Sequence, residues 1–128
     1  MAAASDYLED ELLDHALGTG SFTAPSAVYV ALFTAAPNDA GGGTELSGDG
    51  YARQECAFNA ASGGSASNTS DETFTASGGD WGTITHVGLF DASTSGNLLF
   101  HGALSASQVV NDGGSLTFSA GSLTVSLA

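Results

Sequence analysis

The segment from Trp81 to Leu104 constrains the fold more than any other part of the chain. It reads W-G-T-I-T-H-V-G-L-F-D-A-S-T-S-G-N-L-L-F-H-G-A-L, two apolar runs at Ile84–Phe90 and Leu98–Leu104 joined by turn-forming residues. The β-branched and aromatic residues in both runs predict a β-hairpin whose loop is longer than the tight two-residue type. Neither run alternates cleanly, so we expect the hairpin to lie in the middle of a sheet or to be covered on both faces.

The remainder of the chain predicts a mainly β fold. Its 18 glycines, with many Ser, Thr and Ala, indicate frequent turns. Besides the hairpin, strands are expected at Ala27–Phe33, Tyr51–Asn59, Glu72–Ala76, Gln108–Val110, Ser115–Ser119 and Ser122–Leu127. About seven or eight short strands separated by turns are typical of an antiparallel β-sandwich or a small barrel. The length favours one domain over residues 1–128.

One helix is predicted at the N-terminus, over Ser5–Leu17. Ser5 or Asp6 can cap it, and Asp6 with Glu9 has capping-box spacing. Gly18 suits the position that ends a helix. Its apolar stripe consists of Leu8, Leu12, Leu13, Ala16 and Leu17. We expect the helix to pack on its own sheet, because the nearest partner for a short amphipathic helix is intramolecular. An interaction handle is the alternative.

The charge is strongly unbalanced, with 14 acidic residues against one basic residue, Arg53, and a formal net charge of −13. Direct nucleic-acid binding is therefore not expected, and neither is attraction to an anionic membrane. No lysine is present, which excludes a lysine nucleophile, a Schiff base and a P-loop. The sequence contains no stretch of 18 apolar residues, so no transmembrane helix is predicted. The single cysteine, Cys56, cannot form an intrachain disulfide and is expected to be a small buried residue.

The histidines offer the best starting point for a metal site. His86 and His101 fall on the two hairpin strands, nearly opposite each other if the hairpin closes near Phe90 and Leu98. Two histidines and an aspartate can hold zinc, but no H-x-H or HExxH motif is present. We therefore expect His86, His101 and also His15 to have structural roles. Each strand also carries a glycine just after its histidine, which marks a bulge or a close backbone approach.

No motif predicts a catalytic, cofactor-binding or metal-binding residue. A G-x-S-x-G elbow is absent, and Ser and Asp are too common for a triad to be recognised. The long loop Thr34–Gly50 is expected to be an interaction element. Asp39, Glu45 and Asp49 flank its glycines, so weak Ca²⁺ binding is conceivable, although EF-hand spacing is absent. Asn68-Thr69-Ser70 matches a glycosylation sequon, which matters only in a secretory pathway.

Arg53 stands out because it is the chain's only fixed cation. Arginine binds carboxylates through two parallel hydrogen bonds, which lysine does less well. Two readings are open: an ion pair that anchors the acidic loop within its own subunit, or a contact across a subunit interface.

Four stretches resemble a family of short virion proteins of tailed bacteriophages and prophages, commonly described as phage tail fibre or structural proteins. They are Y-L-E-D-E-L-L-D-H-A-L-G, V-Y-V-A-L-F-T-A-A-P with G-G-G-T-E-L-S-G-D-G-Y-A-R-Q, W-G-T-I-T-H-V-G-L-F-D, and G-N-L-L-F-H-G-A-L. The C-terminal L-T-F-S-A-G-S-L-T-V-S-L is similar as well. Arg53 matches the family's Y-A-R motif, which the resemblance implies is an interface or structural anchor. The family has no catalytic motif to transfer.

The resemblance and the composition together predict a non-enzymatic virion protein without cofactors, assembled in the bacterial host cytoplasm. A fibre proper is long and repetitive, whereas this chain is short and without repeats. We therefore expect an accessory module on the particle exterior, first of all a capsid decoration or cement protein. The alternative is a tail-fibre, tail-tip or baseplate-associated module, or a host-glycan-binding adhesin. The expected partners are other virion proteins and further copies in a homo-oligomer or symmetric array, not nucleic acid or membrane.

Overall fold

The structure, a computed structural model, describes residues 3–127 and confirms the mainly β fold class. In this part of the chain, ten strands accompany one helix. In order they are β1 (Ala3–Ala4), α1 (Asp6–Leu17), β2 (Val28–Ala35), β3 (Thr44–Glu45), β4 (Gln54–Cys56), β5 (Ser65–Ser67), β6 (Glu72–Thr75), β7 (Gly82–Phe90), β8 (Leu98–Val110), β9 (Ser115–Phe118) and β10 (Thr124–Ser126).

The predicted hairpin is β7–β8, and it lies at the centre of the main antiparallel sheet. The strand order is β1-β8-β7-β2-β3, and β4 pairs with the same edge of β2 as β3 does. Leu89 and Val87 of β7 lie opposite Val30 and Leu32 of β2. Strand β7 therefore has a paired strand at each edge, which places the hairpin in the middle of a sheet as predicted.

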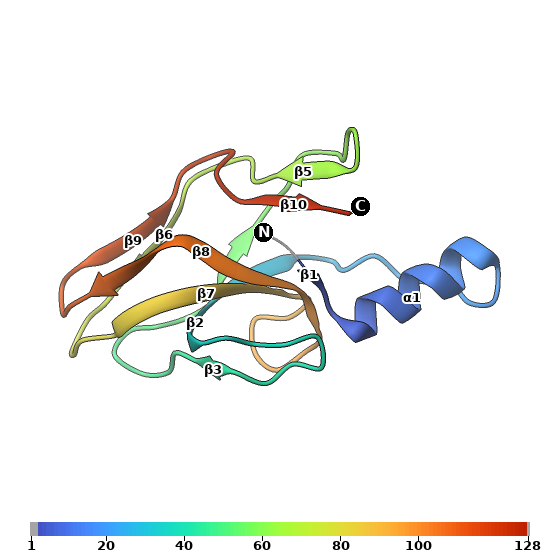
Figure 1. The fold of residues 1–128 in the computed structure, drawn as a ribbon. Coiled ribbons are helices and arrows are strands. Elements are labelled where there is room, and N and C mark those ends of the chain that lie inside the picture. Colours follow the sequence, from blue (N-terminus) through green and yellow to red (C-terminus); the bar gives the residue numbers. More distant parts are fainter. Residues whose placement is uncertain (1–2, 128) are drawn as a thin grey trace.

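A second layer covers one face of the main sheet and makes the fold sandwich-like. It consists of two antiparallel ribbons, β10–β5 and β6–β9, which lie above β7 and β8 in the view of Figure 1. The core fills the space between the layers. Its buried members are Val30, Leu32, Cys56, Phe74, Ala76, Trp81, Ile84, Val87, Leu89, Val110, Leu116 and Leu123.

Besides the hairpin, two of the predicted strands differ from the observed bounds by more than two residues. Gln108–Val110 is not a separate strand but the end of β8, which pairs with β7 as far as Val110 opposite Gly82. Backbone pairing extends a strand regardless of its side chains, so the polar residues after Leu104 concealed this continuation. The strand expected at Tyr51–Asn59 shortens to β4, because pairing with β2 stops at Cys56.

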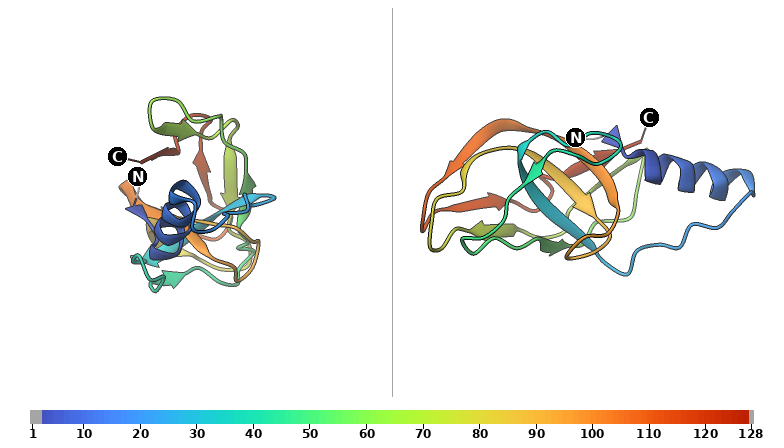
Figure 2. Two further views of the ribbon diagram at one scale, coloured as in Figure 1. Left: turned by 90° about the vertical axis from the view of Figure 1, so that its right-hand side faces the viewer. Right: turned by 90° about the horizontal axis from the view of Figure 1, so that it is seen from below.

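Helix α1 projects away from both layers, as Figures 1 and 2 show. Leu8 is its buried residue, whereas the side chains of Leu13 and Leu17 are exposed. The expectation that the whole apolar stripe packs on the chain's own sheet is therefore wrong. The return segment, residues 18–27, forms no strand that could cover the far end of the helix.

Candidate functional site

Arg53 lies at the centre of the densest polar cluster in the described part of the chain. Its Nε and Nη2 donate to the two carboxylate oxygens of Glu45, at 2.9 and 2.8 Å. Its Nη1 donates to the carbonyl oxygens of Ala92 and Ser95, at 2.9 and 2.8 Å. The guanidinium carbon lies 3.7 Å from the centre of the Phe90 ring, so the cation also stacks on an aromatic face.

Tyr51 extends this cluster into the core. Its hydroxyl donates to Glu45 Oε2 at 2.6 Å and accepts a hydrogen bond from the Leu32 amide at 3.1 Å. The Tyr51 ring contacts the rings of Phe74 and Trp81. Glu45 is thereby held from two sides, one on the sheet surface and one in the core.

The electrostatics of the cluster favour the charged forms of its ion pair. Burial raises the pKa of Glu45, but the hydrogen bonds from Arg53 and Tyr51 and the Arg53 charge outweigh it and lower the net value. For Arg53, the Glu45 hydrogen bonds outweigh burial and raise the pKa. Burial and the bond to Glu45 raise the pKa of Tyr51 far above its ordinary range, so its hydroxyl stays a donor.

These contacts support the first of the two readings of Arg53, an anchor within its own subunit. Glu45 belongs to β3, inside the long acidic loop, and Ala92 and Ser95 belong to the loop that joins β7 to β8. Arg53 therefore joins the nearby acidic loop to the β7–β8 loop, whose contacting residues lie 39 and 42 positions further along the chain. The Arg53 side chain is 8% exposed, which leaves little of it available to a neighbouring subunit.

Gly88 of β7 lies beneath the aromatic rings on which Arg53 stacks. A Cβ at this position would lie 2.9 Å from Cε1 of Phe33 and 3.3 Å from Cε1 of Phe90. The two rings are stacked with their centres 6.2 Å apart, and Arg53 covers the ring of Phe90. Glycine thus allows the rings to close over the strand, so side chains rather than another backbone make the close approach at Gly88.

The base of helix α1 is fixed firmly to the sheet. The Ser5 amide donates to Leu99 O at 2.9 Å, and its hydroxyl donates to Leu98 O. Ser5 is also the N-cap, because its Oγ accepts from the Leu8 amide at 3.2 Å. The predicted Asp6–Glu9 capping box is therefore wrong, since the helix begins one residue earlier than that pairing requires.

The far end of α1 is closed by local hydrogen bonds. Gly18 adopts a left-handed conformation with φ 76°, as predicted for the residue that ends the helix. The amides of Thr19 and Gly20 donate to Asp14 O, and the Thr19 hydroxyl donates to Asp14 Oδ1 at 2.8 Å. The Phe22 amide donates to His15 Nδ1, so His15 has a structural role.

The structure does not bring the two hairpin histidines directly opposite each other. The hairpin closes at the predicted pair, Phe90 opposite Leu98, but a one-residue register shift follows, so that His86 pairs with Ala103 and His101 pairs with Gly88. His86 Nδ1 lies 2.8 Å from the Thr85 hydroxyl, and His101 Nε2 lies 2.7 Å from Asp39 Oδ1. Each histidine thus has a separate polar partner, and the two do not form the paired ligands that the zinc alternative required.

The carboxylates considered for Ca²⁺ also lie in different surroundings. The Asp39 carboxylate contacts His101 and the Glu45 carboxylate binds Arg53, while the Asp49 carboxylate lies beside Gly79. The three therefore do not share a coordination sphere.

Asn68 of the sequon is 1% exposed, and its side chain joins Ser70, Ser119 and Leu123 by hydrogen bonds. The sequence did not reveal this structural role, because the N-x-S/T pattern is the same whether its asparagine is buried or exposed.

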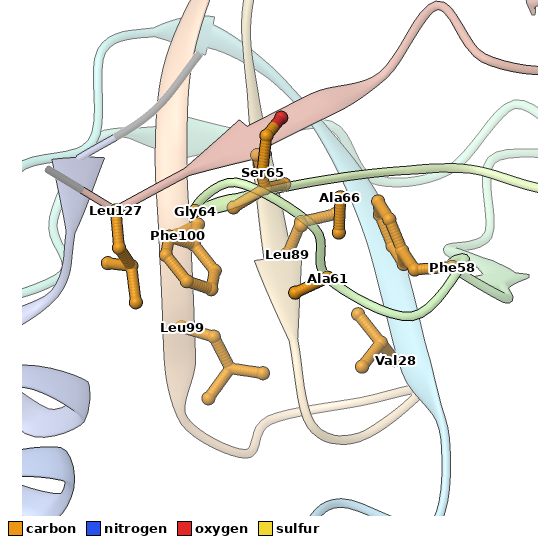
Figure 3. Close-up of a pocket in the computed structure, with 11 residues that line it drawn as sticks. Val28, Phe58, Ala61, Gly64, Ser65, Ala66, Leu89, Leu99, Phe100 and Leu127 are labelled. Atoms are coloured by element: carbon orange, nitrogen blue, oxygen red, sulfur yellow. The ribbon is translucent and has the colours of Figure 1, made fainter.

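An almost wholly apolar hollow lies where β2, β7 and β8 meet the β5–β10 ribbon. Figure 3 shows side chains of these strands, and of the chain before β5, gathered around it. The lining includes Val28, Phe58, Leu89, Leu99, Phe100 and Val125. Ser65 contributes the one polar side chain of the lining. A catalytic or sugar-binding pocket needs several convergent polar groups, so this hollow suits an apolar group instead.

In the part described by the structure, no helix has the length and apolar character needed to cross a membrane.

Comparison with known proteins identifies the family. A comparison with curated proteins gives no match. The family model described as "Podophage GP4 fiber I protein gp80" matches residues 3–126, nearly the whole chain. The chain therefore belongs to this family of phage fibre proteins.

Proposed function

We propose that the chain is a non-enzymatic structural module of the phage tail fibre apparatus. The observation that carries this proposal is the family match over residues 3–126, since a phage fibre family implies a virion structural protein. This supports the tail-associated alternative of the sequence analysis more than capsid decoration. Its partners are then other virion proteins, which it joins during assembly in the host cytoplasm.

The architecture suits a connecting module rather than a fibre shaft. A shaft is built from repeated units, and this sequence shows no tandem repeat. Instead, the Arg53 cluster fixes the loops at one face, and Ser5 fixes a projecting helix to the sheet. A rigid body with one protruding element fits a position where the fibre is attached to another component.

Capsid decoration is a second candidate, and two observations favour it. The chain is short and packs around one core cluster, as expected of an accessory protein on a shell. Its net charge of −13 is compatible with the exterior of a particle that encloses DNA.

Copy number per particle distinguishes the two positions. We would purify virions and measure the ratio of this chain to the major capsid protein by quantitative mass spectrometry, with gold-labelled antibody to locate it. A tail fibre module should be present in a handful of copies, with label at the tail. A ratio approaching the capsid protein's, with label over the head, would instead support decoration.

A further inference from the structure

The free surface of helix α1 combines exposed leucines with a line of carboxylates. Leu13 is 57% exposed and Leu17 is 74% exposed. Glu9, Leu13 and Leu17 are spaced four residues apart, so they lie along one side of the helix. Leu8 lies on the side turned to the sheet, since it is buried. The helix therefore presents a second apolar face that its own chain leaves uncovered.

The helix is also held ready for binding. Ser5 attaches its first turn to β8, and Gly18, Thr19 and Gly20 complete its last turn through Asp14 and His15. A helix of 12 residues is only marginally stable alone in water. These caps keep it ordered without a partner, so binding would incur little ordering cost.

The charge of the helix restricts the chemistry of what can cover it. Its five carboxylates are those of Asp6, Glu9, Asp10, Glu11 and Asp14, and it contains no lysine or arginine. A surface that buries Leu13 and Leu17 must approach several of these carboxylates. Such a surface gains attraction only if it carries positive charge.

A second copy of the chain cannot supply that charge. Its only lysine or arginine is Arg53, whose guanidinium already binds Glu45, Ala92 and Ser95. Docking of α1 on another copy would therefore bring further negative charge to an acidic helix, and the other copy has no free lysine or arginine to offset it.

We propose that α1 docks into an apolar groove, bordered by Lys and Arg side chains, on a different virion protein. This inference rests on the proposed function, because it assigns the helix as the attachment point of the module. The mode is that of an amphipathic helix laid into a groove, with Leu13 and Leu17 as anchors and the flanking carboxylates as the selective element.

The test uses purified full chain and phage particles produced without it. Binding is measured by co-sedimentation over a series of NaCl concentrations. We expect the double substitution Leu13→Ser and Leu17→Ser to weaken binding about ten-fold or more. Val109→Ser is the matched control, since Val109 is 65% exposed on β8, and it should bind like wild type. Glu9→Gln should weaken binding and reduce its salt dependence, whereas Glu55→Gln should do neither.

Each outcome separates the inference from the function on which it rests. Because Leu13 and Leu17 are exposed, their serine variant should unfold at the wild-type temperature, so lost binding would not reflect misfolding. Wild-type protein that fails to bind the particles would overturn the proposed function, and the inference with it. Binding that survives the leucine substitutions would overturn the inference alone. Wild-type chain that self-associates in ultracentrifugation, and loses this with the same substitutions, would assign a second copy and also refute it.

Discussion

Replacing Arg53 by alanine tests the central feature of the fold with one change. The substitution removes four hydrogen bonds, two to Glu45 and one each to the carbonyls of Ala92 and Ser95. It also removes the stacking on Phe90. The variant would contain no lysine or arginine, and Glu45 would remain without its cationic partner.

The expected loss of unfolding free energy is about 3 kcal/mol. Removing one partner of a buried ion pair typically destabilises by about 3–5 kcal/mol, and a cation–aromatic contact adds about 1 kcal/mol. The lower end applies here, because the Glu45 side chain is 25% exposed and water can replace part of the lost contacts. Arg53→Lys should lose about half as much, since an ammonium keeps the charge but cannot reproduce the paired geometry.

Urea unfolding followed by the fluorescence of Trp81, the only tryptophan, measures this loss. With a slope of about 2 kcal/mol per molar urea, the midpoint should fall by about 1.5 M. Glu55→Ala, which removes an exposed charge from β4, should change stability by less than about 0.5 kcal/mol. A double-mutant cycle with Glu45→Gln should give a coupling of at least about 1 kcal/mol. An Arg53→Ala protein within about 1 kcal/mol of wild type would refute the anchor.

Three further predictions concern single sites. The lowered pKa of Glu45 means that its carboxylate stabilises the fold above its unfolded-state pKa, and that this stability disappears as pH falls through the lower folded pKa. The stability difference between wild type and Glu45→Gln should therefore shrink below about pH 4 in urea titrations; a constant difference would contradict it. Gly88→Ala should destabilise by about 1–3 kcal/mol through crowding against Phe33, and wild-type stability would exclude that crowding. Burial and the Glu72 charge raise the pKa of Cys56 to about 12, so a thiol reagent at pH 8 should react only after unfolding.

The central sheet could be predicted from the sequence because its strands are marked by what they bury. Ile84–Phe90 and Ala27–Phe33 are apolar on both faces, and such runs need both faces covered. The short strands β1 and β3 could not be predicted. Each has two residues of ordinary composition and exists only through its pairing with β8 or β2. Backbone pairing of this kind imposes no residue pattern by which the strand could be recognised in the sequence.

The candidate site was only half visible in the sequence, for a similar reason. Charge counting identified Arg53, and the acidic loop was identified as its neighbour. The partner carbonyls of Ala92 and Ser95 could not be found, since every residue has a carbonyl and only the fold selects these two. The position of α1 was also misjudged, because Leu8 and Leu17 look alike in a helical pattern although one is buried and the other is 74% exposed.

Because Arg53 is bound within its own subunit, it is not available to offset the repulsion between copies of the acidic chain. A chain with net charge −13 repels its own copies, and the one residue that could bridge them is already bound within each subunit. The screening length is about 8 Å at physiological ionic strength, so only carboxylates close to a contact between copies would experience this repulsion strongly. In the homo-oligomer or array expected from the sequence, acidic residues at a contact between copies would be favoured by compensation from outside the chain. A basic partner that receives the acidic helix of each copy would supply it, and copies would then be positioned by that partner rather than by one another.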